Sequence, residues 1–333
     1  MQKLILLGAI LIFSACQKKD AMRNDFPVFP ASTFLKANDQ VAFQFSAPGI
    51  QLVDAQAIGT VMSDREYQAP EAIEVTQRVH LKFKREKDRA QIPIYLLEAN
   101  TSIFTYQNDW ISLDLGDKVL ESNVWGVNQS NQKINHLALT QFPIEEDQYI
   151  AWKWAATNQQ AHTILAYPEI VFGWKPWRNT STTSELPRPL NQIKSIPVKY
   201  QYEGSAKGSY NLAFDCWINA GTSISKENIL TEVMVWEDWS NLNPVGQMKE
   251  RLESPYGTYE VWEGTTTEGW NCLTFRKVPP ASDGDIDLHW FLKYLIAKGV
   301  IQDTQILASV EFGNEIGKGT GVTIIKNYQI KIQ

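Results

Sequence analysis

Short alternations of apolar and polar residues recur along most of the chain, and this period of two predicts β-strands. After residue 102 the apolar runs have the length of single strands, and turn-forming residues separate them. These runs lie at residues 103–106, 119–125, 149–154, 164–172, 193–202, 209–218, 231–236, 258–263, 272–276, 309–312 and 321–331. Many short strands with intervening turns indicate an all-β jelly-roll sandwich of two antiparallel sheets.

One segment departs from this period. Residues 285–299 carry apolar side chains at helical spacing, with an aspartate at the start and a glycine at the end. The apolar positions are Leu288, Phe291, Leu292 and Leu295. We therefore expect one amphipathic helix that lies on the outer face of a sheet.

The first hundred residues predict a separate small unit. Alternation at 41–45, 79–83 and 92–97 indicates a small β module over residues 27–100, followed by the jelly roll over residues 101–333. No chemistry is visible in this module. We expect it to be a spacer, and an accessory sugar-binding surface is the alternative.

The first residues read as a targeting signal. Residues 1–15 hold one early lysine, an apolar stretch and small residues, which is typical of a signal peptide and too short to span a membrane. The Phe-Ser-Ala-Cys sequence that ends at Cys16 resembles a bacterial lipobox. We expect a lipid on Cys16, a tether over residues 16–26, and an outer-membrane lipoprotein on the periplasmic or cell-surface side. An ordinary signal peptide is the alternative.

Composition excludes several function classes. The net charge is -6 and residues 82–87 are the only basic run, so nucleic acid is not an expected partner. The chain has three cysteines, too few for a disulfide framework, and Cys216 and Cys272 lie in strand-like runs. A bond between these two and a pair of buried thiols both remain open. The four histidines are scattered, so we expect no metal site. The 12 tryptophans suit a β core, and three or four of them suit a carbohydrate groove.

The strand at 231–236 carries the first candidate chemistry. Period two sends Glu232, Met234 and Trp236 to one face, while the other face is apolar and β-branched. A carboxylate between a thioether and an indole suits a sugar cleft, where aromatic planes hold pyranose rings. Glu315 lies far along the chain, so only the fold can bring it to Glu232. Paired carboxylates of this kind are needed for glycoside hydrolysis.

Asp215 is the second candidate, because it stands in the middle of the apolar run at 209–218. A buried aspartate is costly unless it is hydrogen-bonded. If this strand neighbours residues 231–236, Asp215 comes within reach of Glu232, and the two carboxyls would share a proton. A simple cap or ion pair is an equally good reading.

Seven short segments occur in one order and together resemble glycoside hydrolase family 12, the compact β-jelly-roll endoglucanases and xyloglucanases. The resemblance covers roughly residues 115–333. The segments are Asn-Val-Trp-Gly at 123–126, Tyr-Pro-Glu-Ile-Val-Phe-Gly at 167–173, the run at 210–217, Glu-Val-Met-Val-Trp at 232–236, Pro-Val-Gly at 244–246, Tyr-Glu-Val-Trp-Glu-Gly at 259–264 and Glu-Phe-Gly-Asn-Glu at 311–315.

This resemblance implies a role for each matching residue. It implies Glu232 as nucleophile, Glu315 as acid/base and Asp215 as the residue hydrogen-bonded to the nucleophile. The implied sugar contacts are Trp125, Asn123, Met234 and Trp236. The implied enzyme is a retaining endo-β-1,4-glucanase or xyloglucan-specific endoglucanase that needs neither metal nor cofactor. Its partner would be a β-glucan, either cellulose-type, xyloglucan or mixed-linkage, and we expect a monomer.

Two alternatives and one departure accompany this reading. A surface lipoprotein that binds glycans without turnover, or a xyloglucan transglycosylase, would share the same face. Residues 174–178 replace the small polar stretch that the family more usually has there, and a long N-terminal segment precedes the resemblance. The far subsites, and with them the exact glucan, therefore stay open.

Overall fold

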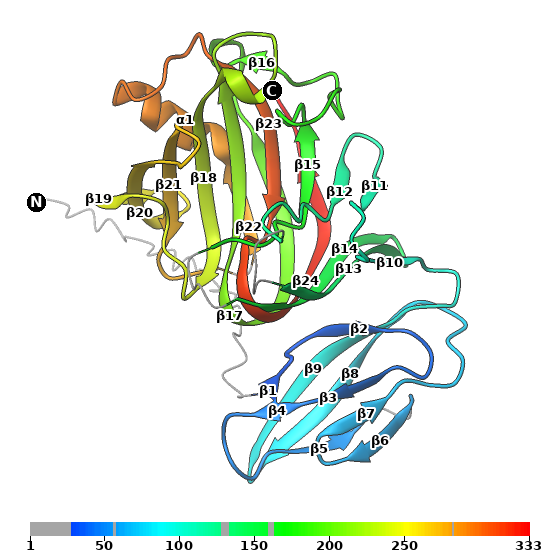
Figure 1. Ribbon diagram of the computed structural model, residues 1–333. Helices are drawn as coiled ribbons and strands as arrows, with labels where there is room; N and C mark the ends of the chain where they lie inside the picture. The colour runs from blue at the N-terminus through cyan, green and yellow to red at the C-terminus, as the bar shows by residue number, and fades with distance from the viewer. Residues whose placement is uncertain (1–27, 56–57, 128–132, 159–162, 282) are drawn as a thin grey trace, which may run out of the picture.

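The fold is organised around one long strand, β17 (Pro197–Asn219), which belongs to both layers of the sandwich (Figure 1). Its first part pairs with β24 (Ile316–Ile330) and β22 (Asp283–Asp287). Its last part pairs with β18 (Ile229–Ser240) and β23 (Ile306–Gly313). The two strands expected at 193–202 and 209–218 are therefore one.

A glycine pair allows β17 to continue between the layers. Gly208 lies opposite Gly319, and both have φ above +100°. A Cβ atom at Gly208 would lie 2.1 Å from the carbonyl oxygen of Lys318, so only glycine fits there.

The computed structural model describes residues 28–333 except 56–57, 128–132, 159–162 and 282. The predicted signal peptide, the predicted lipidation site at Cys16 and the whole of the predicted tether lie outside the described residues. Within the described part, no helix is long and apolar enough to cross a membrane.

Two layers form from one curled sheet. The outer layer runs in the order β10 (Ile103–Thr105), β13 (Lys133–Ile144), β14 (Asp147–Thr157), β24, β17 and β22. The inner layer runs in the order β11 (Ser112–Asp114), β12 (Val119–Glu121), β15 (Glu169–Gly173), β23, β17, β18, β21 (Asn271–Lys277), β20 (Gly257–Thr265) and β19 (Gln247–Ser254), with β16 (Arg188–Pro189) beside β23. The predicted all-β sandwich is confirmed. The pair β18–β21 is parallel, where antiparallel sheets were expected.

The main core fills the space between these layers. Along β17, Phe214 and Cys216 point into it, and the ring of Phe214 stacks on Phe312 with centroids 4.2 Å apart. Cys272 lies beside Glu232 in the strand register, on the face of the inner layer opposite to that of Cys216, and both cysteines are free, buried thiols. Because the two thiols lie on opposite faces of one layer, they cannot form a bond without breaking the sheet.

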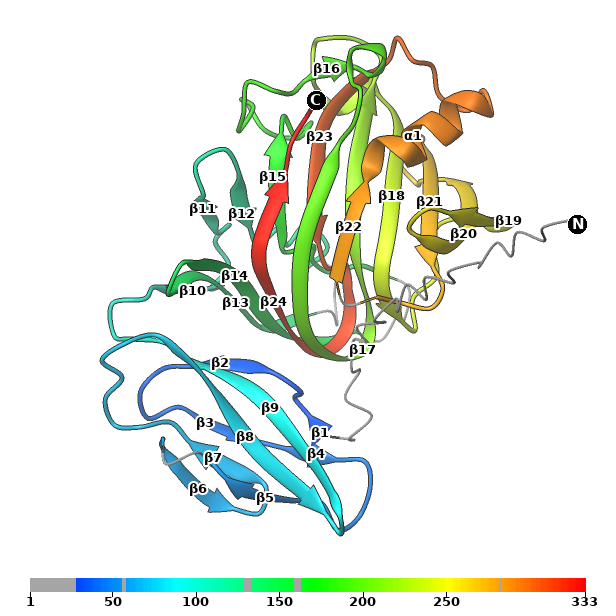
Figure 2. The ribbon, with the colours of Figure 1, turned by 180° about the vertical axis from the view of Figure 1, so that it is seen from behind.

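The predicted helix is confirmed as α1 (Leu288–Ala297). The side chain of Asp287 accepts from the backbone N–H of His289 at 3.0 Å and caps its first turn. The helix begins later than expected because the preceding residues form β22. Phe291 packs edge-on against Tyr259 and at a tilt against Phe275, so α1 covers β20 and β21 (Figure 2).

The first part of the described chain forms a small module with its own core. One sheet has the order β2 (Thr33–Leu35), β9 (Asp88–Leu96), β8 (Gln77–Arg85) and β5 (Gln51–Asp54). A second has the order β3 (Gln40–Ala42), β7 (Glu66–Gln68) and β6 (Thr60–Ser63), and β1 (Val28–Phe29) pairs with β4 (Gln44–Phe45). Tyr67 and Phe83 are buried between the sheets.

The module is attached to the outward face of the outer layer. Phe34 and Tyr95 pack against Phe142 and Tyr149 in a separate apolar cluster. The Tyr95 hydroxyl donates to Glu203 on β17 at 2.8 Å, and Arg78 pairs with the same carboxylate at 2.6 Å. The module thus packs against β13 and β14 of the outer layer, and both ribbon views show it below the sandwich (Figures 1 and 2).

Replacing Tyr95 with alanine should weaken this attachment. The ring contacts Phe142 and Tyr149 with centroids 5.7 and 5.3 Å away, so its loss should lower the free energy of unfolding by about 3 kcal/mol or more. Tyr95→Phe keeps the ring and removes only the hydrogen bond to Glu203, which is worth about 1 kcal/mol. Chemical denaturation measures both. Equal losses in the two variants would show that the hydrogen bond, not the ring, attaches the module.

Candidate active site

Two of the predicted acidic residues, Asp215 and Glu232, lie on the outward face of the inner layer, in neighbouring rows of the strand register. In the strand register, Asp215 on β17 lies directly opposite Glu311 on β23 and Met234 on β18. Trp217 lies opposite Glu232 in the next row. Because opposite residues in an antiparallel pair share a face, Asp215 and Glu232 stand on one surface, one row apart.

Glu315 reaches this surface from the end of β23. Alternation continues from Glu311 through Gly313 to Glu315, which directly precedes β24. Asn211 on β17 holds this segment in three ways: its backbone N–H donates to the Glu315 carbonyl at 3.1 Å, its Oδ1 accepts from the Glu315 N–H at 2.8 Å, and its amide donates to the Glu315 carboxylate. The side-chain orientation of Glu315 is thus determined by one asparagine.

Sequence reasoning missed Asn211, although a signal was present. Asn211, Ala213, Asp215 and Trp217 share one parity along the strand, so a polar side chain at 211 belongs on the same face as Asp215.

Glu232 has an equally specific partner. The indole N–H of Trp270, in the turn between β20 and β21, donates to Glu232 Oε2 at 2.9 Å. Trp270 packs edge-on against Trp217 and Trp177, with centroids 5.6 and 6.2 Å away. The three indoles hold the donor in place. Sequence reasoning did not select Trp270, because its partner is far away along the chain.

Burial raises the pKa values of all three candidate acids, and the charges of neighbouring carboxylates add to this effect. Burial raises the pKa of Glu232 to about 7, and the hydrogen bond from Trp270 counteracts this. Burial, followed by the charge of Glu232, raises the pKa of Glu315 to about 8. Burial, followed by Glu232 and Glu311, raises the pKa of Asp215. The pKa of Glu315 is thus raised further than that of Glu232.

Asp215 has one oxygen that no other described residue satisfies. Its Oδ1 is buried without a hydrogen-bond partner, and the indole N–H of Trp217 on the same face is also unpaired within the described chain. The hydrogen bond between Asp215 and Glu232 stays a prediction. Unpaired polar atoms on this face are available to a ligand hydroxyl or to a water molecule.

The predicted sugar contacts differ in exposure. The side chain of Trp125, after β12, is 56% exposed and offers an open aromatic face. Met234 and Trp236 are 4% and 2% exposed, so they form the floor below the surface. Asn123 is buried, and its amide donates to Glu169 Oε1 at 2.6 Å. Its contact with a sugar stays a prediction.

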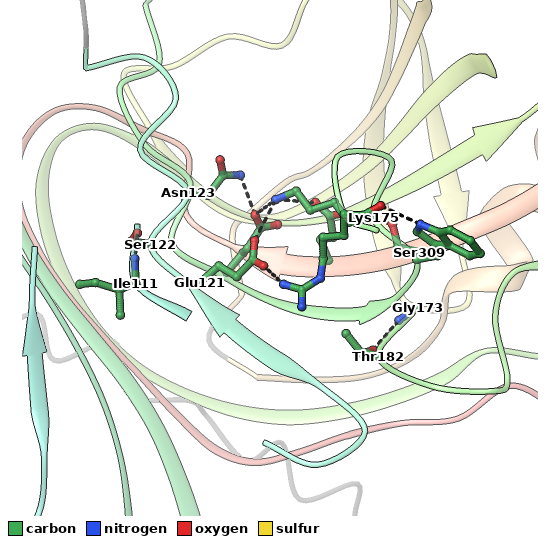
Figure 3. Close-up of polar contacts among 12 residues, drawn as sticks. Ile111, Glu121, Ser122, Asn123, Gly173, Lys175, Thr182 and Ser309 are labelled. Carbon is green, nitrogen blue, oxygen red and sulfur yellow. Dashed lines mark hydrogen bonds and ion pairs between the residues drawn. The ribbon is translucent and has the colours of Figure 1, made fainter. Parts of the chain in front are cut away.

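Glu169 belongs to a buried ionic cluster beside these acids. Figure 3 labels Lys175 and Glu121 of this cluster, with Asn123 next to them. Lys175 Nζ donates to Glu169 and lies 3.4 Å from Glu121 Oε2 and 3.8 Å from Glu311 Oε2. Arg178 pairs with Glu121. Residues 174–178, the departure from the family pattern that left the far subsites open, thus bring two cations to this face.

The other end of the face is aromatic and cationic. Arg276, opposite Trp236 in the register, lies 4.2 Å from the ring centroid of Trp239 and 4.8 Å from that of Trp262. Its guanidinium donates two bonds to Glu260, at 3.0 and 2.6 Å. Over the described residues, no group of histidine, cysteine and acidic side chains could hold a metal ion.

The whole face therefore combines two acids whose pKa values are raised, that of Glu315 further than that of Glu232, with aromatic planes. Such a set supports nucleophilic and acid/base chemistry on an uncharged ligand rich in hydroxyl groups.

Comparison with known proteins gives consistent results. Residues 116–333 match the model of glycosyl hydrolase family 12. Endoglucanase S of Pectobacterium parmentieri is 28% identical over 251 residues, which are 72% of this chain and 92% of the relative.

Solved structures show the same fold. A family 12 xyloglucanase from Bacillus licheniformis superposes with a TM-score of 0.62 at 26% identity, covering 70% of this chain and all of that one. Endoglucanase cel12A from Rhodothermus marinus superposes with a TM-score of 0.57 at 23% identity, covering 70% of this chain and 99% of that one.

Proposed function

Because this chain belongs to glycosyl hydrolase family 12, we propose that it is a retaining, endo-acting hydrolase of β-1,4-glucosidic bonds in soluble β-glucans. The supporting observation is a pair of acids on one face, Glu232 held by Trp270 and Glu315 held by Asn211, in which the charge of Glu232 raises the pKa of Glu315. The names of the relatives, an endoglucanase and a xyloglucanase, favour cellulose-type glucan, mixed-linkage glucan or xyloglucan as substrate.

The first step forms a covalent intermediate. A carboxylate oxygen of Glu232 attacks C1 of the sugar while the bond from C1 to the leaving oxygen breaks. Glu315 transfers its proton to that oxygen, so the leaving sugar departs as a neutral alcohol. This requires the two carboxyl groups to lie about 5–5.5 Å apart.

The second step releases the product. Water attacks C1 and gives a proton to Glu315, and the bond from C1 to Glu232 breaks, which restores the β configuration. Esterified Glu232 no longer repels charge, so the pKa of Glu315 falls and Glu315 can act as a base. Asp215, protonated beside the nucleophile, would donate a hydrogen bond to it and favour its ionised form.

Product analysis tests this function directly. The protein should release reducing ends from carboxymethylcellulose, xyloglucan and barley-type β-glucan, with a rapid fall in viscosity and an initial product of β configuration. Binding without any release would support the non-catalytic lipoprotein. Redistribution of xyloglucan oligosaccharide lengths without net reducing ends would support the transglycosylase.

The pH profile follows from the two raised pKa values. Glu232 must be ionised and Glu315 protonated, so kcat/KM should fall below about pH 7 and above about pH 8. Initial rates on an aryl β-cellobioside over a range of pH measure both limbs. In Glu315→Gln the alkaline limb should vanish. A profile whose acidic limb lies near 4.5, the ordinary glutamate value, would contradict the expected shift.

Removing the indole donor should move the acidic limb. Trp270→Phe keeps an aromatic ring against Trp217 but loses the hydrogen bond to Glu232. That bond favours the charged form of Glu232, so its loss should raise the pKa of Glu232. The acidic limb of kcat/KM should shift upward by about half a unit or more, and kcat should fall about tenfold. Trp239→Phe is the control for the loss of an indole donor, because its N–H is bonded to the backbone carbonyl of Lys277 and not to an acid. Its acidic limb should stay at the wild-type position. An unshifted limb in Trp270→Phe would exclude this role.

We also propose that Cys16 carries a lipid that holds the enzyme at the outer membrane. The sequence that ends at Cys16 supports this, together with the apolar segment before it. Cys16→Ser should move the protein from the membrane fraction to the soluble fraction and abolish the incorporation of labelled palmitate. Membrane retention of this variant would exclude the lipid anchor.

A further inference from the structure

The outward face of the inner layer, which carries Asp215, Glu232 and Glu315, is called the catalytic face below. Lys175 is the most deeply buried cation in its described part. Its side chain is 5% exposed, and the carboxylates of Glu121, Glu169 and Glu311 around it are at most 2% exposed. Burial alone would lower the pKa of Lys175, but the three carboxylates outweigh burial and raise it. The lysine is therefore charged, and a buried charge of this kind persists only with such partners.

These carboxylates stand directly beside the catalytic acids. Glu311 lies opposite Asp215 in the register of β17 and β23, and Glu169 lies opposite Gly313, two residues before Glu315. The Glu311 charge raises the pKa of both Asp215 and Glu232. An uncompensated Glu311 would thus oppose ionisation of the nucleophile.

We propose that Lys175 is a positioning residue of the catalytic centre, whose buried ammonium compensates Glu169 and Glu311 behind Asp215 and so keeps Glu232 available as the ionised nucleophile. This inference rests on the proposed function. The inference assigns to residues 174–178 an electrostatic role beneath the catalytic face, in addition to any role in contacting the glucan.

Other groups around the cluster do not replace this cation. Arg178 pairs with Glu121, the carboxylate farthest along the layer from Asp215, and Ser309 donates to Glu311 Oε1 at 3.1 Å as a neutral partner. The remaining titratable groups that bear on these acids are neutral or acidic, and they are Tyr167, Cys216, Cys272, Glu268 and Glu315. Lys175 is thus the cation that faces Glu311 among the described residues.

A merely structural role would have a different signature. Breaking a buried ion pair by removing one partner destabilises a protein wherever the pair lies. Lys277 forms such a pair with Glu237, whose side chain points into the core rather than onto the catalytic face. Lys277→Met is therefore the matched control for lost stability without a change at the acids.

The experiment compares the pH profiles of Lys175→Met, Lys175→Arg and Lys277→Met on an aryl β-cellobioside. In Lys175→Met, the acidic limb of kcat/KM should move upward by at least about half a unit, and kcat should fall about tenfold with KM nearly unchanged. Lys175→Arg and Lys277→Met should keep the wild-type limb, whatever stability they lose. Denaturation curves at the assay temperature establish that each variant is folded.

A double variant keeps the inference testable if Lys175→Met fails to fold. Lys175→Met/Glu311→Gln removes the cation together with the charge that it compensates near Asp215, so its acidic limb should return to the wild-type position. A wild-type limb in folded Lys175→Met, or a shifted limb in the double variant, would overturn the inference. If the wild type itself cleaves no β-glucoside, the proposed function fails instead, which separates the two outcomes.

Discussion

Glu232→Ala should lower kcat on soluble β-glucans by about a thousandfold or more while the glucan still binds. The variant lacks the oxygen that attacks C1, so no covalent intermediate forms, whereas Trp125 and the aromatic floor remain. Reducing-end assays measure the loss, and affinity electrophoresis in β-glucan gels measures the retained binding.

Chemical rescue makes this prediction specific. Azide should restore turnover of an activated aryl β-cellobioside by Glu232→Ala, and the product should be the α-glycosyl azide, because azide enters from the side of the missing carboxylate. Glu263→Gln, an exposed carboxylate on β20, is the control and should keep wild-type activity. Full activity of Glu232→Ala on polysaccharide would refute the assignment of the nucleophile.

Glu315→Gln should have the second-largest effect, and its size should depend on the leaving group. A sugar alkoxide needs a proton to depart, so kcat on polysaccharide should fall by about a hundredfold to a ten-thousandfold. A dinitrophenyl leaving group needs no proton, so formation of the glycosyl-enzyme from that substrate should be nearly unaffected.

Pre-steady-state kinetics with the dinitrophenyl substrate would show this as a burst of phenolate followed by slow turnover. The amide introduced by Glu315→Gln has an oxygen that can still accept from Asn211, so loss of fold does not explain the effect. Equal losses on both substrates would mean that Glu315 only holds the segment between β23 and β24 in place and is not the acid.

The strand at 231–236 shows what the sequence could predict. One face of β18 is buried in the core and the other is lined by functional groups, so the period of two was visible without any partner. The same holds for Asp215 on β17 and for the apolar stripe of α1. In each case, a local pattern is imposed by one buried face.

The sequence pattern did not predict the strands that lack one continuously buried face. Nearly every side chain of β19 (Gln247–Ser254) is exposed or half-exposed, since it is the last strand of the inner layer, so its charged sequence carries no alternation. β13 (Lys133–Ile144) mixes exposed and buried positions across a bulge between Ile134 and His136, which interrupts the period. The merging of two runs into β17 depends on the facing glycines of β24.

The missed parts of the site are partners rather than acids. Trp270 and Asn211 act on residues 38 and 104 positions away, respectively, and no local spacing encodes such a pairing. The sequence indicated Lys175 only as part of residues 174–178, which depart from the usual pattern of the family. Its role depends on three strands of the inner layer, each of which contributes one buried glutamate.

The attachment of the small module to the outer layer has a consequence for access. The described chain starts at β1, and two residues after this strand Ala31 donates its backbone N–H to the Ser205 hydroxyl on β17 at 2.7 Å. The catalytic face is on the opposite side of both layers. If Cys16 carries the proposed lipid, the tether would join the described chain at the small module, away from the face that carries Glu232 and Glu315, and a long glucan could reach that face without passing the module.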